Sequence, residues 1–515
     1  MRGFFYNKSP LIFSVTYSVY MDSSAFPLQL TPNNLSKLVD SASSISIQND
    51  YKKKLRENHR FLQHRLDQGD EIYGVNTGFG PLVHNQVSNE DILTLQENLL
   101  QQLGCNVGPS LTYRESRAVL LVRLNAISRG FSGISEELAE HIVNFYNSGL
   151  APHLQEWGSV GASGDLVPLS RLARVFLGKD SVINKDKTVQ PNSQKLLDEY
   201  DLPPYQLKPK EGLALVNGTS FSAALTALSV HQLNYLFSKI WLPLIATSFH
   251  LFDDSIQHLS ERIYDLKAHD SAKTVAKELR GWMAPLRPED SFGTPQPPYS
   301  SRSAVLWMGA VLERLQQSEK LTTEELNSVD DNPLFFSDDQ KILHAANFQG
   351  TYIAMAADEA HTASLNAANL IERIINRLTN VHISEGFPPF LAPEPVGLHS
   401  GLQGLQLLTT SLLAKLRGKN PVQGTQTFPT NADNQDVVSM SANAALNLRE
   451  STQILTTISA AFLLNLARAQ QIKPCSFGDQ LSHFWADFEY ETSLNFSELS
   501  YSEELEKLVQ KLTRK

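Results

Sequence analysis

The residues best suited to unusual chemistry lie in one short stretch, Gly158 to Leu172, which reads G-S-V-G-A-S-G-D-L-V-P-L-S-R-L. At its centre, Ala162, Ser163 and Gly164 lie among small residues that let the backbone turn sharply. None of these three side chains is a good acid, base or metal ligand, so any reactivity must come from the backbone. In a tight turn the Gly164 nitrogen attacks the Ala162 carbonyl carbon, and loss of two waters leaves a ring with a methylidene derived from Ser163. Such a ring is an electrophile.

This stretch resembles the active-site signature of the histidine and aromatic amino-acid ammonia-lyase family, whose members build the prosthetic group MIO (4-methylideneimidazole-5-one) from Ala-Ser-Gly. The resemblance implies that MIO forms autocatalytically from Ala162, Ser163 and Gly164, and that the site uses no metal ion. A bare Ala-Ser-Gly tripeptide indicates only a small-residue loop, followed here by a helix that Asp165 would cap. The longer string and the motifs below favour the family.

A second motif, E-I-Y-G-V-N-T-G-F-G, spans Glu71 to Gly80 and surrounds Tyr73 with glycines. Glycine-rich segments interrupt regular structure and can form a mobile lid, with Tyr73 at its hinge. The motif closely matches the lid of the family, and this match implies that Tyr73 is the catalytic base. Because free tyrosine has a pKa of about 10, a nearby positive charge or hydrogen-bond donors must favour its phenolate.

A third motif, P-Q-P-P-Y-S-S-R, gathers Gln296, Tyr299 and Arg302 on a proline-constrained loop. An arginine can fork two hydrogen bonds onto a carboxylate, so Arg302 is suited to anchor the α-carboxylate of an amino acid. The family pattern Q-x-P-Y-S-x-R matches this motif. The match implies that Tyr299 acts near the MIO and that Gln296 orients the substrate.

Three further segments match the family and supply one site residue each. E-G-L-A-L-V-N-G-T-S implies that Asn217 hydrogen-bonds the MIO carbonyl and the substrate, and A-N-F-Q-G implies that Phe348 lies beside the MIO and the substrate ring. P-T-N-A-D-N-Q-D-V-V-S-M implies that Gln435 lies near the active site of a neighbouring subunit. N-S-V-D-D-N-P-L also matches, so the resemblance covers nearly everything from Tyr73 to Met440.

Two positions bear on the substrate. Leu103 stands where members acting on histidine or tyrosine tend to carry a ring-contacting histidine, and it resembles the phenylalanine-type pocket; ordinary core packing explains it equally well. Counting back from Pro429 without gaps, Lys415 falls where histidine and phenylalanine lyases generally have a glutamate. In the pocket, Lys415 would favour an anionic or acceptor-bearing substrate; otherwise it is the basic end of a helix. The substrate stays open between the histidine and the phenylalanine/tyrosine type.

The elements that position these residues are predicted to be helices. Leu93 to Gly104 and Tyr113 to Ser128 have helical spacing, with Arg117 and Arg123 on faces other than the apolar one. Asp180 to Leu207 is a polar, proline-containing excursion. Long helical patterns follow at Ser222–Leu259, Ser303–Glu319, Asn347–Asn380, Leu402–Leu416 and Val437–Gln471. No sheet pattern competes with them, so a helical bundle is expected.

The resemblance implies the all-α ammonia-lyase fold, which is fumarase/aspartase-like, with a long central bundle and a smaller N-terminal part that bears the MIO. We expect four segments: 1–21, an extension or mis-assigned start; 22–220, the N-terminal part with lid and MIO segment; 221–475, the central bundle; and 476–515, a C-terminal helical tail. Residues before Met21 loosely resemble a secretory signal but contain Pro10 and no convincing cleavage site. Family members are homotetramers whose active sites draw loops from several subunits.

Composition excludes several classes of partner. A net charge of −10 without any basic block argues against nucleic acid or an anionic membrane, which leaves small molecules such as an amino-acid substrate. The two cysteines, Cys105 and Cys475, are too few for a disulfide scaffold or a zinc knuckle and suit a reducing cytoplasm. The uncharged run Ser451–Ala467 contains Ser, Thr, Gln and Asn, so we expect a buried helix rather than a membrane span.

Three functions fit these motifs. A lyase would release ammonia and an α,β-unsaturated acid. An aminomutase would use the same electrophile and return the amine to the β-carbon, and no residue separates the two. A non-catalytic helical scaffold is the third possibility, and the intact Ala162-Ser163-Gly164 with Tyr73 and Arg302 argues against it.

Overall fold

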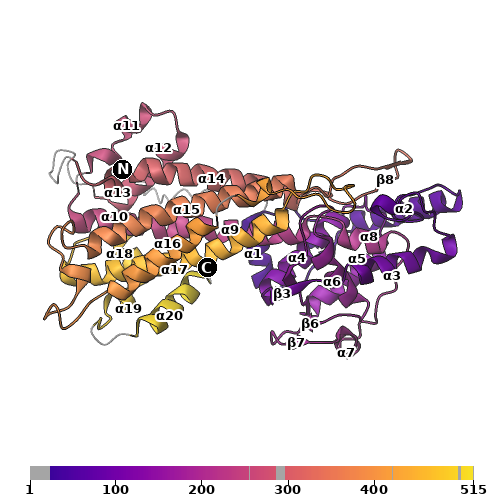
Figure 1. Ribbon diagram of the computed structural model, residues 1–515, viewed down its shortest axis with the longest axis horizontal. Coiled ribbons are helices and arrows are strands. Elements are labelled where there is room, and N and C mark those ends of the chain that lie inside the picture. The colour runs from indigo at the N-terminus through magenta and orange to yellow at the C-terminus, as the bar shows by residue number, and fades with distance from the viewer. Residues whose placement is uncertain (1–23, 255, 286–295, 420–421, 497–499, 514–515) are drawn as a thin grey trace, which may run out of the picture.

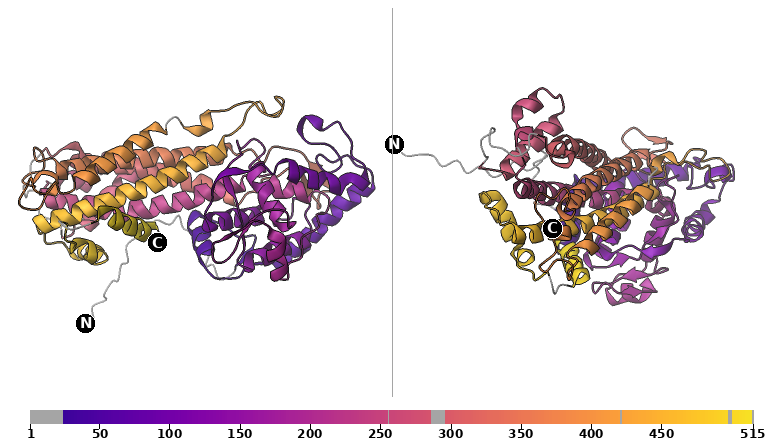
Figure 2. Two further views of the ribbon diagram at one scale, coloured as in Figure 1. Left: turned by 60° about the horizontal axis from the view of Figure 1, so that its bottom comes forward. Right: turned by 60° about the vertical axis from the view of Figure 1, so that its left-hand side comes forward.

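The computed structural model describes residues 24–254, 256–285, 296–419, 422–496 and 500–513. The predicted N-terminal extension, 1–21, lies outside these residues. Along the long axis of the molecule, a bundle of long helices adjoins a smaller part built from the N-terminal residues (Figures 1 and 2). This arrangement confirms the predicted helical-bundle fold with a smaller N-terminal part.

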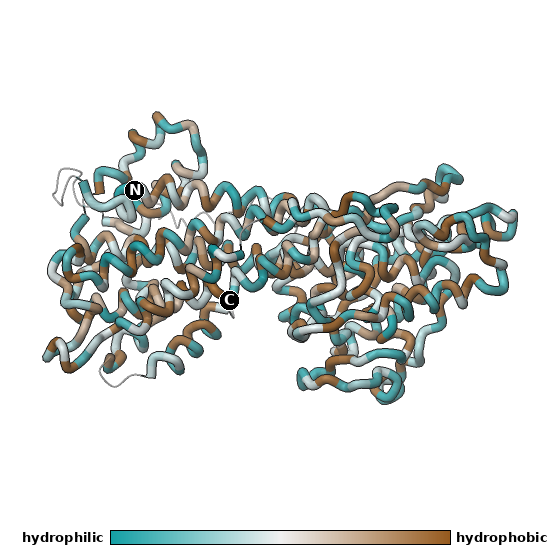
Figure 3. Tube along the Cα trace, viewed as in Figure 1, coloured by the Kyte–Doolittle hydropathy of each residue, from teal (hydrophilic) through white to brown (hydrophobic). Residues whose placement is uncertain are grey.

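The bundle is built from helices close to those that the apolar spacing predicts. They are α9 (Ser220–Tyr235), α10 (Leu242–Phe252), α14 (Ala304–Leu326), α15 (Thr351–Thr379), α16 (Gln403–Gly418) and α17 (Ser441–Ile472), with a π-helical stretch, Leu236–Trp241, joining α9 to α10. Helix α15 packs against both α14 and α17. Hydrophilic and hydrophobic residues alternate along these helices (Figure 3), as expected where one face is buried and another faces outward.

Residues Ser451–Ala467 lie inside α17, where most side chains are buried. Among the described helices, none combines the length and apolar character needed to cross a membrane.

Short helices cover the ends and sides of the bundle. They are α11 (Glu261–Asp265), α12 (Asp270–Trp282), α13 (Tyr299–Arg302), α18 (Asp479–Ala486), α19 (Glu489–Thr492) and α20 (Tyr501–Thr513). Single 3-10 turns occur at Gln257–Leu259, Pro389–Leu391 and Gln423–Thr425. Helices α11, α12 and α13 lie at the end of the bundle that is remote from the N-terminal part (Figure 1).

The N-terminal part is also mainly helical. Its helices are α1 (Pro32–Asp40), α2 (Asn49–Asp67), α3 (Ile92–Gln102), α4 (Tyr113–Ile127), α5 (Glu136–Asn147), α6 (Leu166–Phe176), α7 (Ser193–Glu199) and α8 (Glu211–Val216), with 3-10 turns at Gly80–Leu82 and Asn89–Asp91. Thr112 and Glu115 form a capping box that starts α4.

The described strands are only two to four residues long. Parallel β1 (Ala25–Phe26) and β2 (Ser46–Ile47) pair; β3 (Val107–Ser110) pairs antiparallel with β5 (Gln155–Trp157), and β8 (Leu334–Phe336) with β9 (Lys341–Leu343). β4 (Ala151–Pro152), β6 (Val182–Ile183) and β7 (Val189–Gln190) form a three-stranded antiparallel sheet. The predicted polar excursion therefore contains β6, β7 and α7.

Helix α4 differs from its predicted pattern. It packs against α1, α5, α8 and α9, and its side chains are buried on every face from Ser116 to Ile127. Arg117 and Arg123, which we expected away from the apolar face, are only 6% and 0% exposed. Spacing along the chain identifies one apolar face, but only the surrounding helices decide whether the opposite face is covered.

The two parts share a core. The apolar cluster of the N-terminal part includes Ala223 and Leu228 of α9, Ile353 of α15 and Ala445 of α17. The N-terminal portions of three bundle helices therefore insert into the N-terminal part, and the candidate site lies at this junction.

Candidate active site

Residues Ala162 to Gly164, which we call the Ala-Ser-Gly turn, form the irregular backbone between β5 and α6. Gly164 has a φ of +69°, a conformation that favours glycine. A Cβ on Gly164 would clash with the backbone of Gly218, which pairs with it in a single parallel bridge. The sharp turn that the small residues predict is therefore present, and only glycine fits at position 164.

Two predicted site residues donate hydrogen bonds to Ser163. Asn217 Nδ2 donates to Ser163 O at 2.8 Å, and Gln435 Nε2 donates to Ser163 Oγ at 2.8 Å. The orientation of the Asn217 amide is set by Asn332, whose backbone N–H donates to Asn217 Oδ1 at 2.9 Å. The carbonyl oxygen and the hydroxyl oxygen of Ser163 thus each accept a hydrogen bond from a side-chain amide.

Gln435 differs from its predicted place. We expected it near the active site of a neighbouring subunit, yet it contacts Ser163 of its own chain. The loop that carries it, Pro429–Met440, is fastened beside the Ala-Ser-Gly turn, because Ser439 Oγ donates to Gly161 O at 2.8 Å and Met440 N donates to Val160 O at 2.9 Å. We call this segment the Gln435 loop.

Tyr73 reaches the same neighbourhood through the lid. Its hydroxyl oxygen accepts a hydrogen bond from the backbone N–H of Gly80 at 2.9 Å. Gly80 in turn packs closely on Asn431 of the Gln435 loop, whose side-chain nitrogen would lie 2.4 Å from a Cβ at position 80. The lid and the Gln435 loop are therefore in contact.

Phe348 is half-buried in the turn that precedes α15. This turn follows Ala345, whose backbone N–H donates to Asn332 Oδ1 at 2.8 Å. Asn332 also orients Asn217, so the Phe348 turn and the Asn217 side chain are held by one residue.

Leu103 and Lys415 have other contacts. Leu103 ends α3, is half-buried and packs against the core of the N-terminal part. Lys415 lies on α16, where its ammonium group is 2.8 Å from Glu450 of α17 and its side chain is 59% exposed. Their roles as substrate contacts stay predictions.

Gln296, Tyr299 and Arg302 come together as predicted, and we call them the Arg302 cluster. Arg302 Nη1 donates to Gln296 Oε1 at 2.9 Å, and its guanidinium lies 4.9 Å from the centre of the Tyr299 ring. Tyr299 is 71% exposed. The cluster presents a cation and a phenol at the surface of the chain.

Within one chain, however, the Arg302 cluster is remote from Ser163. Ser301, inside the cluster, accepts a hydrogen bond at 2.9 Å from Arg377 in the last turn of α15, whereas Ile353 in the first turn packs in the core of the N-terminal part. At about 1.5 Å rise per residue, these two ends of α15 are about 35 Å apart. Figure 1 shows α13 at one end of the bundle and α6 and α8 in the other part of the molecule.

The sequence analysis missed two buried charges beneath the turn. Arg123 Nη2 is 2.6 Å from Asp330 Oδ1, and both side chains are at most 4% exposed. Arg123 Nη1 also donates to the carbonyl oxygen of Asn217 at 3.1 Å. The motif N-S-V-D-D-N-P-L marked the neighbourhood of Asp330, but no pattern in the chain pairs it with an arginine of α4.

Two further carboxyl groups are buried here. Asp165 precedes α6 but does not cap it with its side chain; its carboxylate instead accepts hydrogen bonds from the N–H and hydroxyl of Ser222 on α9, both at 2.9 Å. Burial raises the pKa of Asp165 to about 6. Burial likewise raises the pKa of Glu325 to about 7, while Thr219 Oγ1 donates to it at 2.5 Å.

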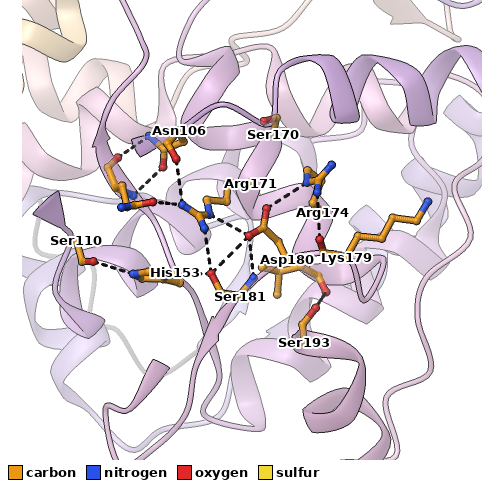
Figure 4. Close-up of polar contacts among 12 residues, drawn as sticks. Asn106, Ser110, His153, Ser170, Arg171, Arg174, Lys179, Asp180, Ser181 and Ser193 are labelled. Carbon is orange, nitrogen blue, oxygen red and sulfur yellow. Dashed lines mark hydrogen bonds and ion pairs between the residues drawn. The ribbon is translucent and has the colours of Figure 1, made fainter. Parts of the chain in front are cut away.

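A polar network fixes α6, the helix that follows the turn (Figure 4). Arg171 donates to Asp180 at 3.0 Å, to the Asn106 carbonyl oxygen at 3.1 Å and to Ser181 Oγ at 3.1 Å. Asn106 Nδ2 also donates to Trp157 O at 2.8 Å, directly before Gly158. The chain is therefore held on both sides of the Ala-Ser-Gly turn.

Comparisons with known proteins found a matching family model and similar sequences and structures. The family model described as aromatic amino acid lyase matches residues 30–489. A tyrosine ammonia-lyase of Cereibacter sphaeroides is 36% identical over 433 residues, covering 80% of this chain and 82% of the relative. A histidine ammonia-lyase of Geobacillus thermodenitrificans is 34% identical over 394 residues, covering 76% and 77%. The crystal structure of a tyrosine aminomutase from Streptomyces globisporus superposes with a TM-score of 0.88 at 29% identity, covering 96% of each chain.

Proposed function

Since this chain belongs to the aromatic amino acid lyase family and is a carbon–nitrogen lyase, we propose that it eliminates ammonia from an aromatic L-amino acid, giving the α,β-unsaturated acid. The substrate is of the histidine or the phenylalanine/tyrosine type. The observation that best supports this proposal is the pair of amide donors, from Asn217 and Gln435, on Ser163 in a turn that only Gly164 can make.

The residues around the turn fit the MIO group. In that ring the carbonyl oxygen of Ser163 is retained, and Asn217 already donates to this oxygen. Gly164 has a left-handed backbone conformation. Because glycine has no Cβ, no side chain obstructs its nitrogen. Asn217 and the backbone of Gly218 would hold the group, and when formed it supplies an electrophilic methylidene carbon for the substrate amine.

Tyr73 takes the proton in this proposal. Removing the weakly acidic β-hydrogen requires a base, and the Tyr73 oxygen, which accepts a hydrogen bond from the Gly80 N–H, receives the proton. The lid that holds Tyr73 also excludes water when it rests on the Gln435 loop.

Arg302 binds the substrate carboxylate, and a second copy of the chain must supply it. A substrate cannot contact both Ser163 and Arg302 of one chain, because the Arg302 cluster lies at the far end of α15 and the two ends of this helix are about 35 Å apart. Large apolar side chains are exposed on α14, α15 and α16, in the Gln435 loop and directly before it, which supports burial between copies: Trp307, Tyr352, Met355, Leu407, Val437 and Phe428. We therefore propose the homotetramer that the family resemblance implies.

The proposal places the enzyme in the cytoplasm. The sequence contains only two cysteines, Cys105 and Cys475, too few for a disulfide scaffold, which suits a reducing compartment.

An aminomutase is the second candidate. The similarity to the tyrosine aminomutase structure extends over nearly the whole chain, so the fold accommodates that reaction as well. The two reactions diverge after ammonia has left the α-carbon: a lyase releases it, and an aminomutase adds it back at the β-carbon.

The test is a measurement of ammonia release from the purified protein with L-histidine, L-phenylalanine and L-tyrosine. Absorbance of the conjugated acid is recorded alongside. We expect release with one member of the panel, accompanied by its unsaturated acid. A β-amino acid without net ammonia would support the aminomutase, and neither product from any member would contradict both candidates.

A further inference from the structure

We propose that Arg123 and Asp330 are positioning residues for maturation of the Ala-Ser-Gly turn: their buried ion pair presses Gly218 against Gly164 and keeps the turn closed while it cyclises. This inference rests on the function proposed above and adds two residues to which that function gives no role. In this role both residues act through the backbone of residues 217–219 and not through contact with the substrate.

The ion pair itself needs an explanation. Arg123 is fully buried in α4, and its partner Asp330 lies 2.6 Å away on a different segment. A buried ion pair often stabilises a fold no better than apolar side chains of similar size, because removing both charges from water is costly. The stability of the fold therefore does not by itself explain this ion pair, and its contacts with the neighbouring backbone indicate its role.

The pair forms hydrogen bonds with the backbone on both sides of Gly218. On one side, Arg123 Nη1 donates to the carbonyl oxygen of Asn217 at 3.1 Å. On the other, Asp330 Oδ2 accepts from the backbone N–H of Thr219 at 2.7 Å. Asn217 and Thr219 are thereby fixed to one rigid group.

Gly218 has no free space between this group and the turn. Its φ is +152°, and a Cβ there would clash with Arg123 Nη1 and Asp330 Oδ2. On its other side, Gly218 O accepts a hydrogen bond from Asp165 N at 2.7 Å and lies against Gly164. Gly218 thus lies between the ion pair and Gly164 and contacts both. Gly164 therefore cannot move toward the ion pair.

Cyclisation depends on such confinement. The Gly164 nitrogen forms a bond to the Ala162 carbonyl carbon; the oxygen of that carbonyl leaves as water with the protons of the Gly164 and Ser163 nitrogens. The Ser163 hydroxyl and α-hydrogen leave as a second water. No oxidant or co-reactant is needed, only close contact between the two reacting atoms. A misplacement of about 1 Å can cost about a hundredfold in rate.

The experiment compares Arg123→Lys with Arg117→Lys. Lysine keeps the charge but cannot fork onto both Asn217 and Asp330. Arg117 is a matched control because it is buried on the same helix and donates only to the carbonyl oxygens of Tyr146 and Leu150, at 3.0 and 3.3 Å. The readout is the intact mass of the folded, assembled protein at successive times after synthesis, which falls by two waters as the turn matures.

We expect Arg117→Lys to mature as the wild type does and Arg123→Lys to mature about a hundredfold more slowly, with unchanged circular dichroism. Maturation of folded Arg123→Lys at the wild-type rate would overturn the inference. If that variant does not fold, the double variant Arg123→Met with Asp330→Leu leaves no buried charge unpaired; it should fold and mature slowly, and wild-type maturation would again overturn the inference. A wild-type chain that never loses two waters would instead overturn the proposed prosthetic group, and this inference with it.

Discussion

Gln435 donates a hydrogen bond to Ser163 Oγ at 2.8 Å, although 272 residues separate the two in the chain. In the proposed maturation of the turn, the hydroxyl that accepts this bond leaves as water. Thr430 Oγ1 donates to Gln435 Oε1 at 2.7 Å, which fixes the amide with its N–H toward Ser163. The Gln435 loop therefore takes part in the site of its own chain.

Removal of this donor should impair the enzyme. We expect Gln435→Leu to slow the loss of water from the turn about tenfold to a hundredfold, because a hydrogen bond to a charged or developing-charge group, here the departing hydroxyl, contributes about 1.5–3 kcal/mol. Gln426→Leu is the control, since Gln426 is half-buried and its side chain donates to the neighbouring Thr425. Equal rates of water loss in the two variants, measured by intact mass, would contradict a role for Gln435.

Ser163→Ala should nearly abolish turnover, because the methylidene carbon derives from the Ser163 side chain. The fold should survive, since the variant removes one hydroxyl from a half-buried residue. Thermal unfolding and intact mass should show a folded chain that has lost no water. An active Ser163→Ala protein would refute the MIO assignment.

If each active site combines residues from different chains, two inactive variants should restore activity when they assemble together. Ser163→Ala and Arg302→Ala chains should each be nearly inactive, but co-expression should restore activity at about a quarter of the sites if the copies mix at random in a symmetric assembly. The restored sites combine Ser163 of one chain with Arg302 of another. Mixed assemblies that form without any regained activity would show that one chain supplies both residues.

The buried carboxyl of Glu325 should make stability depend on pH. Its pKa is raised from 4.5 to about 7, so the folded state holds a proton that the unfolded state loses first. The stability contributed by this proton is complete below pH 4.5 and is lost as pH rises through about 7, which amounts to about 3 kcal/mol at 1.36 kcal/mol per pKa unit.

Glu325→Gln should remove this dependence while keeping an acceptor for Thr219 Oγ1. The measurement is the midpoint of thermal unfolding between pH 4.5 and 8, where the wild type should lose more stability than the variant. Glu324→Gln, at the exposed neighbouring position, is the control and should follow the wild type. Parallel curves for Glu325→Gln and the wild type would contradict the raised pKa.

Leu103 offers a test of specificity. If it lines the pocket, Leu103→His should raise the ratio of kcat/KM for tyrosine to kcat/KM for phenylalanine by about tenfold to a hundredfold, because a polar group then meets the substrate hydroxyl. The ratio, measured by competition, is insensitive to the amount of folded enzyme. An unchanged ratio would leave Leu103 as a core residue, in keeping with its packing against the N-terminal core.

Much of the fold was predictable because helical spacing is a local property. The predicted range Asn347–Asn380 became α15, and Val437–Gln471 became α17, each within a few residues. The Arg302 cluster was likewise predictable, since its three members lie within seven consecutive residues. The burial of Arg123 was not, because it depends on the helices that surround α4.

By itself, the sequence determined the groups available for chemistry. Each group lies within a few adjacent residues, where residue type and spacing decide the local backbone: the Ala162-Ser163-Gly164 tripeptide, Tyr73 in its glycine-rich lid and the Arg302 cluster. Only the tertiary structure decided how these pieces meet. It placed Gln435 on Ser163 of the same chain, set the Arg302 cluster at the opposite end of α15, and put the ion pair of Arg123 and Asp330 behind Gly218. Such contacts join segments that are far apart in the chain, so they depend on which helices pack together, and no local pattern records that.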